Sequence, residues 1–145
     1  MPGQNLTREE AAARADLVTV KNYDVVLDLS GAADPAQETF RSTTTVQFSI
    51  EPAGPGEPAE SAGSDATTFI DLVAPRVHSI VLNGRELDPA QAYVDSRIVL
   101  GDLAPDNELT VVADCAYMRT GEGLHRFTDP ADGETYLYSQ FEVPD

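Results

Sequence analysis

The chain has 145 residues, which is an ordinary length for one domain and too short for a large multi-domain enzyme. Its 25 Asp and Glu residues stand against nine Lys and Arg, giving a formal net charge of -16. A surface this acidic repels phosphate backbones and anionic lipid headgroups, which excludes nucleic acids and membrane surfaces as partners. Hydrophobic residues make up 41% of the chain, which predicts a globular fold.

Cysteine usage and the N-terminal residues bear on the compartment. Cys115 is the only cysteine, so the chain cannot form an internal disulfide and is not a disulfide-stapled secreted scaffold. The N-terminal residues lack the apolar core of a secretory signal, and no stretch approaches the ~18 apolar residues of a membrane span. These features predict a cytoplasmic protein.

A short helix followed by a strand is predicted at the start of the chain. Thr7 and Glu10, three residues apart, form a capping-box pattern ahead of an alanine run, and the helix is expected over Arg8 to Asp16. The apolar period then changes to two. Tyr23 to Leu29 is therefore expected to form a half-buried strand.

The next strand is expected over Phe40 to Ile50, with apolar side chains on one face and polar side chains on the other. Residues 51–65 are rich in Pro, Gly, Ser and Glu and predict a long mobile connection. Strand patterns resume at 67–72 and 77–82. Asn83 and Gly84 favour a tight hairpin turn, and 97–100 is expected to be a short return strand.

Two further strands complete the pattern. Glu108 to Met118 alternates, and its inward side chains are expected to be Leu109, Val111, Ala113, Cys115 and Tyr117. The last run is Glu134 to Val143. Seven or eight strands with one short helix predict an all-β fold, a two-sheet antiparallel β-sandwich forming a single domain over residues 1–145.

Metal and nucleophile chemistry find little support in the sequence. The soft metal ligands His78, Cys115 and His125 are far apart and lack paired spacing, so no zinc site is expected. Cys115 is expected to pack as a small buried hydrophobe, and His78 to lie on the surface. No nucleophile elbow is present, and the Gly-rich residues 121–123 precede a strand region rather than a helix, so they do not predict a phosphate loop.

The C-terminal strand carries the most site-like pattern. Alternation places Tyr136, Tyr138, Gln140 and Glu142 on one side, with Leu137, Ser139, Phe141 and Val143 on the other. A Gln and a Glu two residues apart project in the same direction about 7 Å apart, given a rise of ~3.3 Å per residue. That spacing suits binding of a small polar group such as an amine.

An ordered set of segments resembles the N-terminal β-domain of the aminopeptidase N family, the gluzincin zinc metallopeptidases, in the branch typical of actinobacteria. The segments are YDVVLDL at 23–29, FRSTTTVQF at 40–48, TTFIDLVA at 67–74, LNG at 82–84, GEGLHRF at 121–127 and YLYSQFE at 136–142. The resemblance spans essentially the whole chain and implies a saddle-like, all-β N-terminal domain.

The resemblance implies roles for two residues. Gln140 matches the family's glutamine at the first side-chain subsite, and Glu142 matches the glutamate that helps to bind the substrate's free α-amino group. The family's His-Glu-x-x-His helix, Gly-Ala-Met-Glu-Asn motif and catalytic tyrosine belong to a following domain that is missing here. The resemblance therefore implies that zinc and peptide hydrolysis reside in the longer parent, whose partners are peptide N-termini, and that this chain alone is inactive.

Two other classes remain open from the residues alone. A free-standing β-sandwich that binds a protein or a sugar fits the composition and strand count equally well, since fold alone does not decide function. An independent small enzyme has no constellation of residues to support it. The gene sequence beyond Asp145 distinguishes the aminopeptidase interpretation from both.

Overall fold

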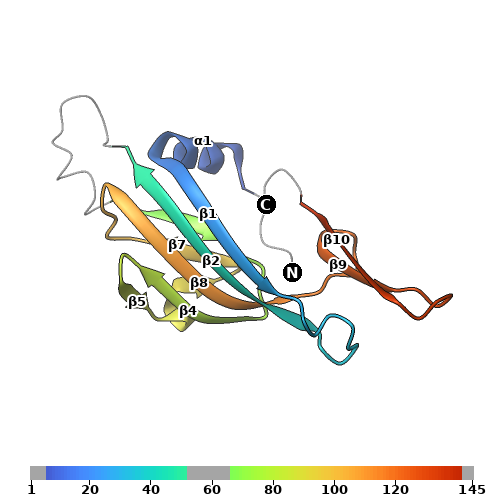
Figure 1. Cartoon of the computed structure of the whole chain (residues 1–145). Coiled ribbons are helices and arrows are strands. Elements are labelled where there is room, and N and C mark those ends of the chain that lie inside the picture. The colour runs from blue at the N-terminus through green and yellow to red at the C-terminus, as the bar shows by residue number, and fades with distance from the viewer. Residues whose placement is uncertain (1–5, 52–65, 142–145) are drawn as a thin grey trace.

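A computed structural model describes residues 6–51 and 66–141, and its largest element is a five-stranded antiparallel sheet (Figure 1). The strand order is β1-β2-β8-β4-β5. These strands are β1 (Val18–Asp28), β2 (Thr39–Ile50), β8 (Asp106–Ala116), β4 (Arg76–Leu82) and β5 (Arg85–Leu87). The short strand β5 and the long strand β1 are therefore its two edges.

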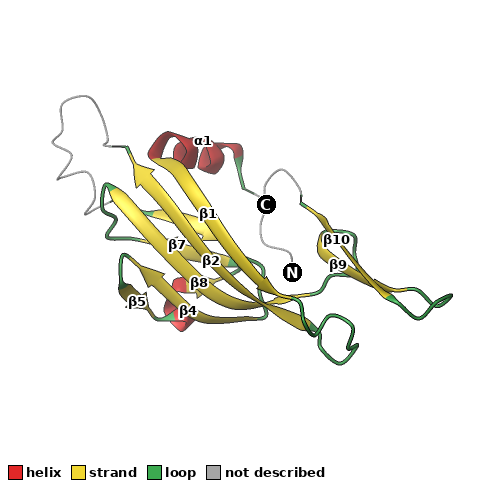
Figure 2. Cartoon of the chain, in the orientation of Figure 1, coloured by secondary structure: helices red, strands yellow, loops and turns green. Residues whose placement is uncertain are grey.

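A three-stranded sheet packs on one face of this larger sheet. It consists of β3 (Thr68–Asp71), β7 (Arg97–Leu100) and β6 (Tyr93–Val94), in the order β3-β7-β6. A four-residue helix, α2 (Pro89–Ala92), leads into β6 and begins at an Asp88 side chain that caps the Ala90 amide. The predicted all-β sandwich of antiparallel sheets is confirmed, and strands dominate the described chain (Figure 2).

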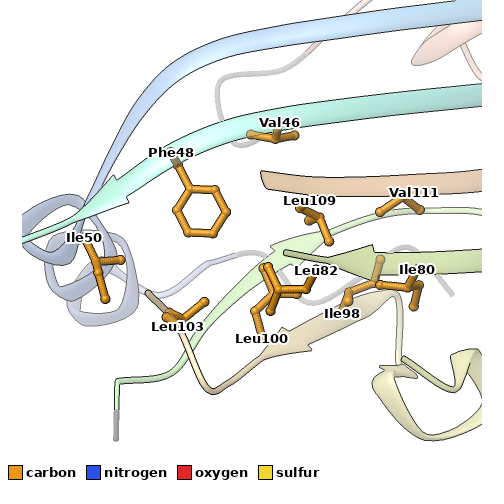
Figure 3. Close-up of a cluster of buried hydrophobic side chains, with 10 residues drawn as sticks. All are labelled: Val46, Phe48, Ile50, Ile80, Leu82, Ile98, Leu100, Leu103, Leu109 and Val111. Carbon is orange, nitrogen blue, oxygen red and sulfur yellow. The ribbon is translucent and has the colours of Figure 1, made fainter. Parts of the chain in front are cut away.

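The core lies between the two sheets (Figure 3). Its buried side chains come from β2, β4, β7, β8 and the turn before β8: Val46, Phe48, Ile50, Ile80, Leu82, Ile98, Leu100, Leu103, Leu109 and Val111. Ile80 and Ile98 are completely buried, and they lie on opposite sheets. Burial of such side chains contributes about 1.5 to 3 kcal/mol each, so this interface is the main source of stability.

The alternation of apolar and polar residues along β2 and β8 explains why one face of these strands is buried. Val46 pairs with Leu109 in the antiparallel register, and both side chains face the core. The intervening residues carry polar side chains to the opposite face, where Gln47 donates to Glu108 and the Thr45 and Thr110 hydroxyls are 3.1 Å apart. The predicted inward residues of both strands are buried, except Cys115, which is half-buried.

The N-terminal helix α1 (Arg8–Leu17) begins at the predicted capping box. Thr7 accepts a hydrogen bond from the Glu10 amide, and the Glu10 carboxylate accepts one from the Thr7 amide. Arg97 of β7 donates to both Glu10 and Asp71 and lies 3.7 Å from the centroid of a phenylalanine ring on β3. These contacts fix α1 to the smaller sheet, although none of its own residues is buried.

The predicted tight hairpin turn at Asn83–Gly84 is confirmed, with positive φ values of 53° and 77°, but the return strand needs correction. The turn leads into β5, which is too short to show an apolar period. Residues 97–100 form β7 in the other sheet and are not the return strand of this turn. Helix α2 is a second helix that the sequence analysis did not include.

Strand β1 is not half-buried. It begins five residues earlier than expected, at Val18, and its predicted inward side chains remain open: Tyr23, Val25 and Leu27 are 54%, 53% and 42% exposed. The cause is the narrowness of the smaller sheet, whose side chains meet β2, β4 and β8 in the core; among the described residues, only Val18 of β1 packs against this core. Most of the predicted connection at 51–65 lies outside the described residues.

The two-stranded sheet of β9 (Gly123–Thr128) and β10 (Thr135–Gln140) projects from the far end of the larger sheet (Figure 1). Arg126 anchors it. This buried side chain donates through Nη1 to the carbonyl oxygens of Gln37 at 2.6 Å and of Ala32 and Asp34 at 3.3 Å, all in the β1–β2 loop. Its guanidinium also lies 4.4 Å from the ring centroid of Tyr117.

The polar face of the larger sheet carries an ion-pair network. Asp114 on β8 accepts a hydrogen bond from Arg41 Nε at 2.6 Å, and its other oxygen is 2.6 Å from His78 Nε2. His78 is therefore a half-buried partner of Asp114 rather than a free surface residue. The hydrogen bonds with Arg41 and, secondly, with His78 lower the pKa of Asp114.

No helix of the described chain is long and apolar enough to cross a membrane.

Replacing Arg126 should destabilise the protein. Arg126→Met leaves three carbonyl oxygens without their shared donor and removes the cation over Tyr117, so we expect a loss of about 2 to 4 kcal/mol in the free energy of unfolding, measured with urea. Arg119→Met is the matched control, because Arg119 is exposed near the same loop. Equal effects of the two variants would contradict the anchoring role.

Asp114 should make stability depend on acid. Because its pKa is lower folded than unfolded, its contribution is fully present above the ordinary value of 3.8 and is lost as the pH falls through the folded value. We expect Asp114→Asn to cost about 1 kcal/mol at pH 5 and much less at pH 2.5. Urea unfolding at both pH values measures this, with exposed Glu122→Gln as control. A pH-independent difference would refute the prediction.

Candidate functional site

The outward face of the β9–β10 sheet is the part of the structure that carries the predicted site strand. In the antiparallel register, Tyr136 pairs with Phe127, Tyr138 with His125, and Gln140 with Gly123. Tyr136, Tyr138 and Phe127 are each 50% exposed, and Gln140 is exposed at the end of β10. The prediction that Tyr136, Tyr138 and Gln140 share one side of a strand is confirmed.

Aromatic stacking stiffens this face next to Gln140. The rings of His125 and Tyr138 stack with centroids 4.7 Å apart and an interplanar angle of 25°. His125 Nδ1 accepts a hydrogen bond of 3.0 Å from the Gly121 amide, where the backbone has a φ of 91°. At the other end, the Tyr136 hydroxyl donates to Asp132 at 2.7 Å, which lowers the pKa of Asp132 and raises that of Tyr136. These contacts brace the two strands at the residues that precede Gln140.

Glu142, the second predicted site residue, lies outside the described residues. The proximity of the Glu142 and Gln140 side chains therefore stays a prediction. What the described residues provide is an exposed amide side chain at the end of a strand, which can donate or accept hydrogen bonds. A side chain of this kind suits the recognition of a polar or peptide-like group.

The three soft metal ligands are dispersed in the fold. His78 lies on β4, Cys115 on β8 and His125 on β9. Among residues 6–51 and 66–141, no three His, Cys, Asp or Glu side chains are grouped so that they could hold a metal ion. The pair of His78 and Asp114 is completed by Arg41, whose positive charge opposes cation binding there.

Cys115 has the properties of a packed thiol. Burial, and secondly the charge of Asp114, raise its pKa above the ordinary value. A thiol that ionises less readily than usual is a poor nucleophile. The expectation that Cys115 packs rather than reacts is consistent with this environment.

A hollow between the β1–β2 loop and β9 was not anticipated from the sequence. Ala32 and Pro35 line one side, and Arg119, Arg126 and Phe127 line the other. It arises because Arg126 draws together segments almost a hundred residues apart in the chain. No local pattern signals such a contact, because the carbonyl groups that accept from Arg126 belong to the backbone.

The sequence of the chain is similar to part of a known protein. No protein-family model matches the chain. Over 146 aligned residues the chain is 56% identical to Aminopeptidase N of Streptomyces lividans. The match covers 100% of this chain but 16% of that protein, so the chain spans about one sixth of the relative's length. The resemblance found in the sequence is therefore confirmed, and the chain, a homologue of aminopeptidase N over its whole length, fits an N-terminal domain of that family.

Proposed function

We propose that this chain is the N-terminal β-domain of a zinc aminopeptidase, a hydrolase that removes N-terminal amino acids from peptides. The observation that carries the proposal is the 56% identity along the whole chain to a part of Aminopeptidase N. In this proposal the domain forms one wall of the substrate cavity, and a following catalytic domain is its main partner.

Gln140 and Glu142 are the proposed substrate-binding residues. Gln140 contacts the side chain of the substrate's first residue, and Glu142 binds its α-ammonium group. The exposed position of Gln140, on the same face of β10 as Tyr138, supports its role, because an exposed amide can donate and accept hydrogen bonds with a bound group. The role of Glu142 rests on the match of Ser139, Gln140, Phe141 and Glu142 to the family motif.

Zinc, which the family resemblance implies, does not fit the described part of this chain. The described residues contain no group of ligands, and the 145-residue sequence contains no His-Glu-x-x-His motif. The metal belongs to the proposed catalytic domain, where it would supply the chemistry of peptide-bond hydrolysis. The proposed contribution of this chain is the binding and orientation of the peptide N-terminus.

The main contribution of the proposed cavity wall to binding is the negative charge of Glu142. A carboxylate that meets an ammonium group in a cavity shielded from water forms a charge-assisted hydrogen bond, which is stronger than the same contact in bulk solvent. The bond orients the first residue of the peptide relative to its scissile bond. A peptide with a blocked N-terminus has no ammonium group and loses this contact.

The division between binding and chemistry is directly testable. We expect the 145-residue chain alone to release no amine from aminoacyl-anilide substrates and to carry no stoichiometric zinc. The full-length product of its gene should do both, as measured by absorbance and by metal analysis. Tight one-to-one zinc in the short chain, or a full-length product without aminopeptidase activity, would contradict the proposal.

Substitutions in the full-length product test the two residues. Glu142→Gln removes the charge directed at the ammonium group, and a charge-assisted hydrogen bond is worth ~1.5 to 3 kcal/mol. We therefore expect a loss of roughly ten-fold to over a hundred-fold in kcat/KM at neutral pH. Gln140→Ala should change the preference among substrates that differ in their first side chain, measured as ratios of kcat/KM.

Two controls accompany these variants. Glu134→Gln removes an exposed carboxylate immediately before β10 and should change kcat/KM by less than about two-fold. An N-acetylated substrate should be insensitive to Glu142→Gln, because it has no ammonium group. If Glu142→Gln slows both substrates equally, or neither, Glu142 does not bind the α-amino group.

A further inference from the structure

Strand β1 forms an open edge of unusual length. Among residues 6–51 and 66–141, its eleven residues pair only with β2, so every second backbone amide and carbonyl group of the strand points away from the described sheet. Edges of this kind are commonly protected by proline or by an outward lysine. β1 contains no proline, and its only lysine, Lys21, reaches across β2 to form an ion pair with Asp106. Its register with β2 shifts once, between Val20 and Asn22, so protection by a bulge is confined to that point, and the residues from Asn22 to Asp28 pair regularly.

One face of β1 is apolar and open to solvent. Val20, Tyr23, Val25 and Leu27, here called the inner row, are 47%, 54%, 53% and 42% exposed. Val20 and Tyr23 pair with Phe48 and Val46 of β2, both of which are only 4% exposed in the core. The apolar surface of the core therefore continues onto β1 beyond the limit of the smaller sheet.

The opposite face of β1 has a different character. Asn22, Asp24 and Asp28 lie there beside the polar face of β2, and Val26 is its one large apolar side chain. A face of this composition is adapted to water. The exposed apolar surface of β1 thus consists of the strand edge and the inner row, and it does not include the polar face.

Charge and chain length decide among the possible occupants. A second copy of the chain would bring another formal charge of -16 to the interface, which opposes self-association. In contrast, 84% of the relative's length lies outside its match to this chain, because the match covers 16% of that protein. A longer polypeptide of this kind would hold its remaining segments near β1 at high effective concentration.

We propose that the β1 edge and the inner row form a docking surface for a β-strand of the same, longer polypeptide. The inference rests on the proposed function, which supplies that polypeptide. The added strand pairs with the free backbone groups of β1 and places apolar side chains over Tyr23 and Val25. Pairing removes the open edge, and the added layer extends the core over the inner row.

Hydrogen exchange tests this arrangement without substitutions. We expect the amides of residues 18–28 to exchange at least about ten-fold more slowly in the full-length gene product than in the 145-residue chain. The central strand β8 is the internal reference, because it is paired on both sides and should be protected in both forms. Equal exchange of β1 in the two forms would overturn the proposal, as would a gene that ends at residue 145.

A matched pair of variants gives a second measurement in the full-length product alone. Val25 and Val26 are adjacent, of the same residue type, and 53% and 61% exposed, but they lie on opposite faces of β1. Val25→Asn should lower the melting temperature by at least about 3 °C, whereas Val26→Asn should change it by less than about 1 °C. Equal shifts would overturn the proposal.

The outcomes separate this inference from the proposed function. A full-length product that cleaves aminoacyl-anilides while β1 exchanges freely would refute the docking surface and leave the function intact. A full-length product in which β1 is protected from exchange but which cleaves no aminoacyl-anilide would support the docking surface and refute the proposed function. A dimer of the 145-residue chain that Val25→Asn dissociates, seen by sedimentation, would assign the edge to a second copy and overturn the proposed occupant.

Discussion

The antiparallel pairing of β2 with β8 is the constraint on which the rest of the structure depends. Its register runs without interruption from Thr39 opposite Ala116 to Ser49 opposite Asp106. A slip of one residue along either strand would turn that strand's core side chains, such as Phe48 or Leu109, toward water. The position of the smaller sheet, the polar outer face and the Asp114 network all follow from this one alignment.

The same pairing determines where the proposed site can be attached. β8 ends at Ala116, and the next residue, Tyr117, packs its ring 5.1 Å from that of Phe40 on β2. The guanidinium group of Arg126 also lies over the Tyr117 ring and reaches the backbone of the β1–β2 loop. The hairpin that carries Gln140 is therefore fixed by a guanidinium group and an aromatic ring, outside the main core cluster.

The sequence was most informative where a pattern was long and local. Strict alternation predicted the faces of β2 and β8, and a capping box predicted the start of α1. It could not predict that residues 97–100 join the smaller sheet, because strand pairing is non-local, nor that the inner row of β1 is left exposed by the described part of the chain. Alternation identifies an apolar face but does not show what packs on it. For the site, alternation predicted the side of β10 on which Gln140 lies. The proposed role of Gln140, in contrast, comes from the family resemblance.

In the proposed function this domain binds substrate without performing the chemistry, and such a domain is effective only if its attachments are rigid. A shift of about 1 Å in a positioning group can cost two orders of magnitude in rate, so the proposed wall formed by β10 would need a defined place relative to the reacting bond. Arg126 ties the hairpin to the larger sheet, and pairing along β1 would tie that sheet to the remaining polypeptide. The buried guanidinium and the open strand edge are thus two links in one chain of contacts that would position Gln140, and loosening either would be felt at the peptide N-terminus.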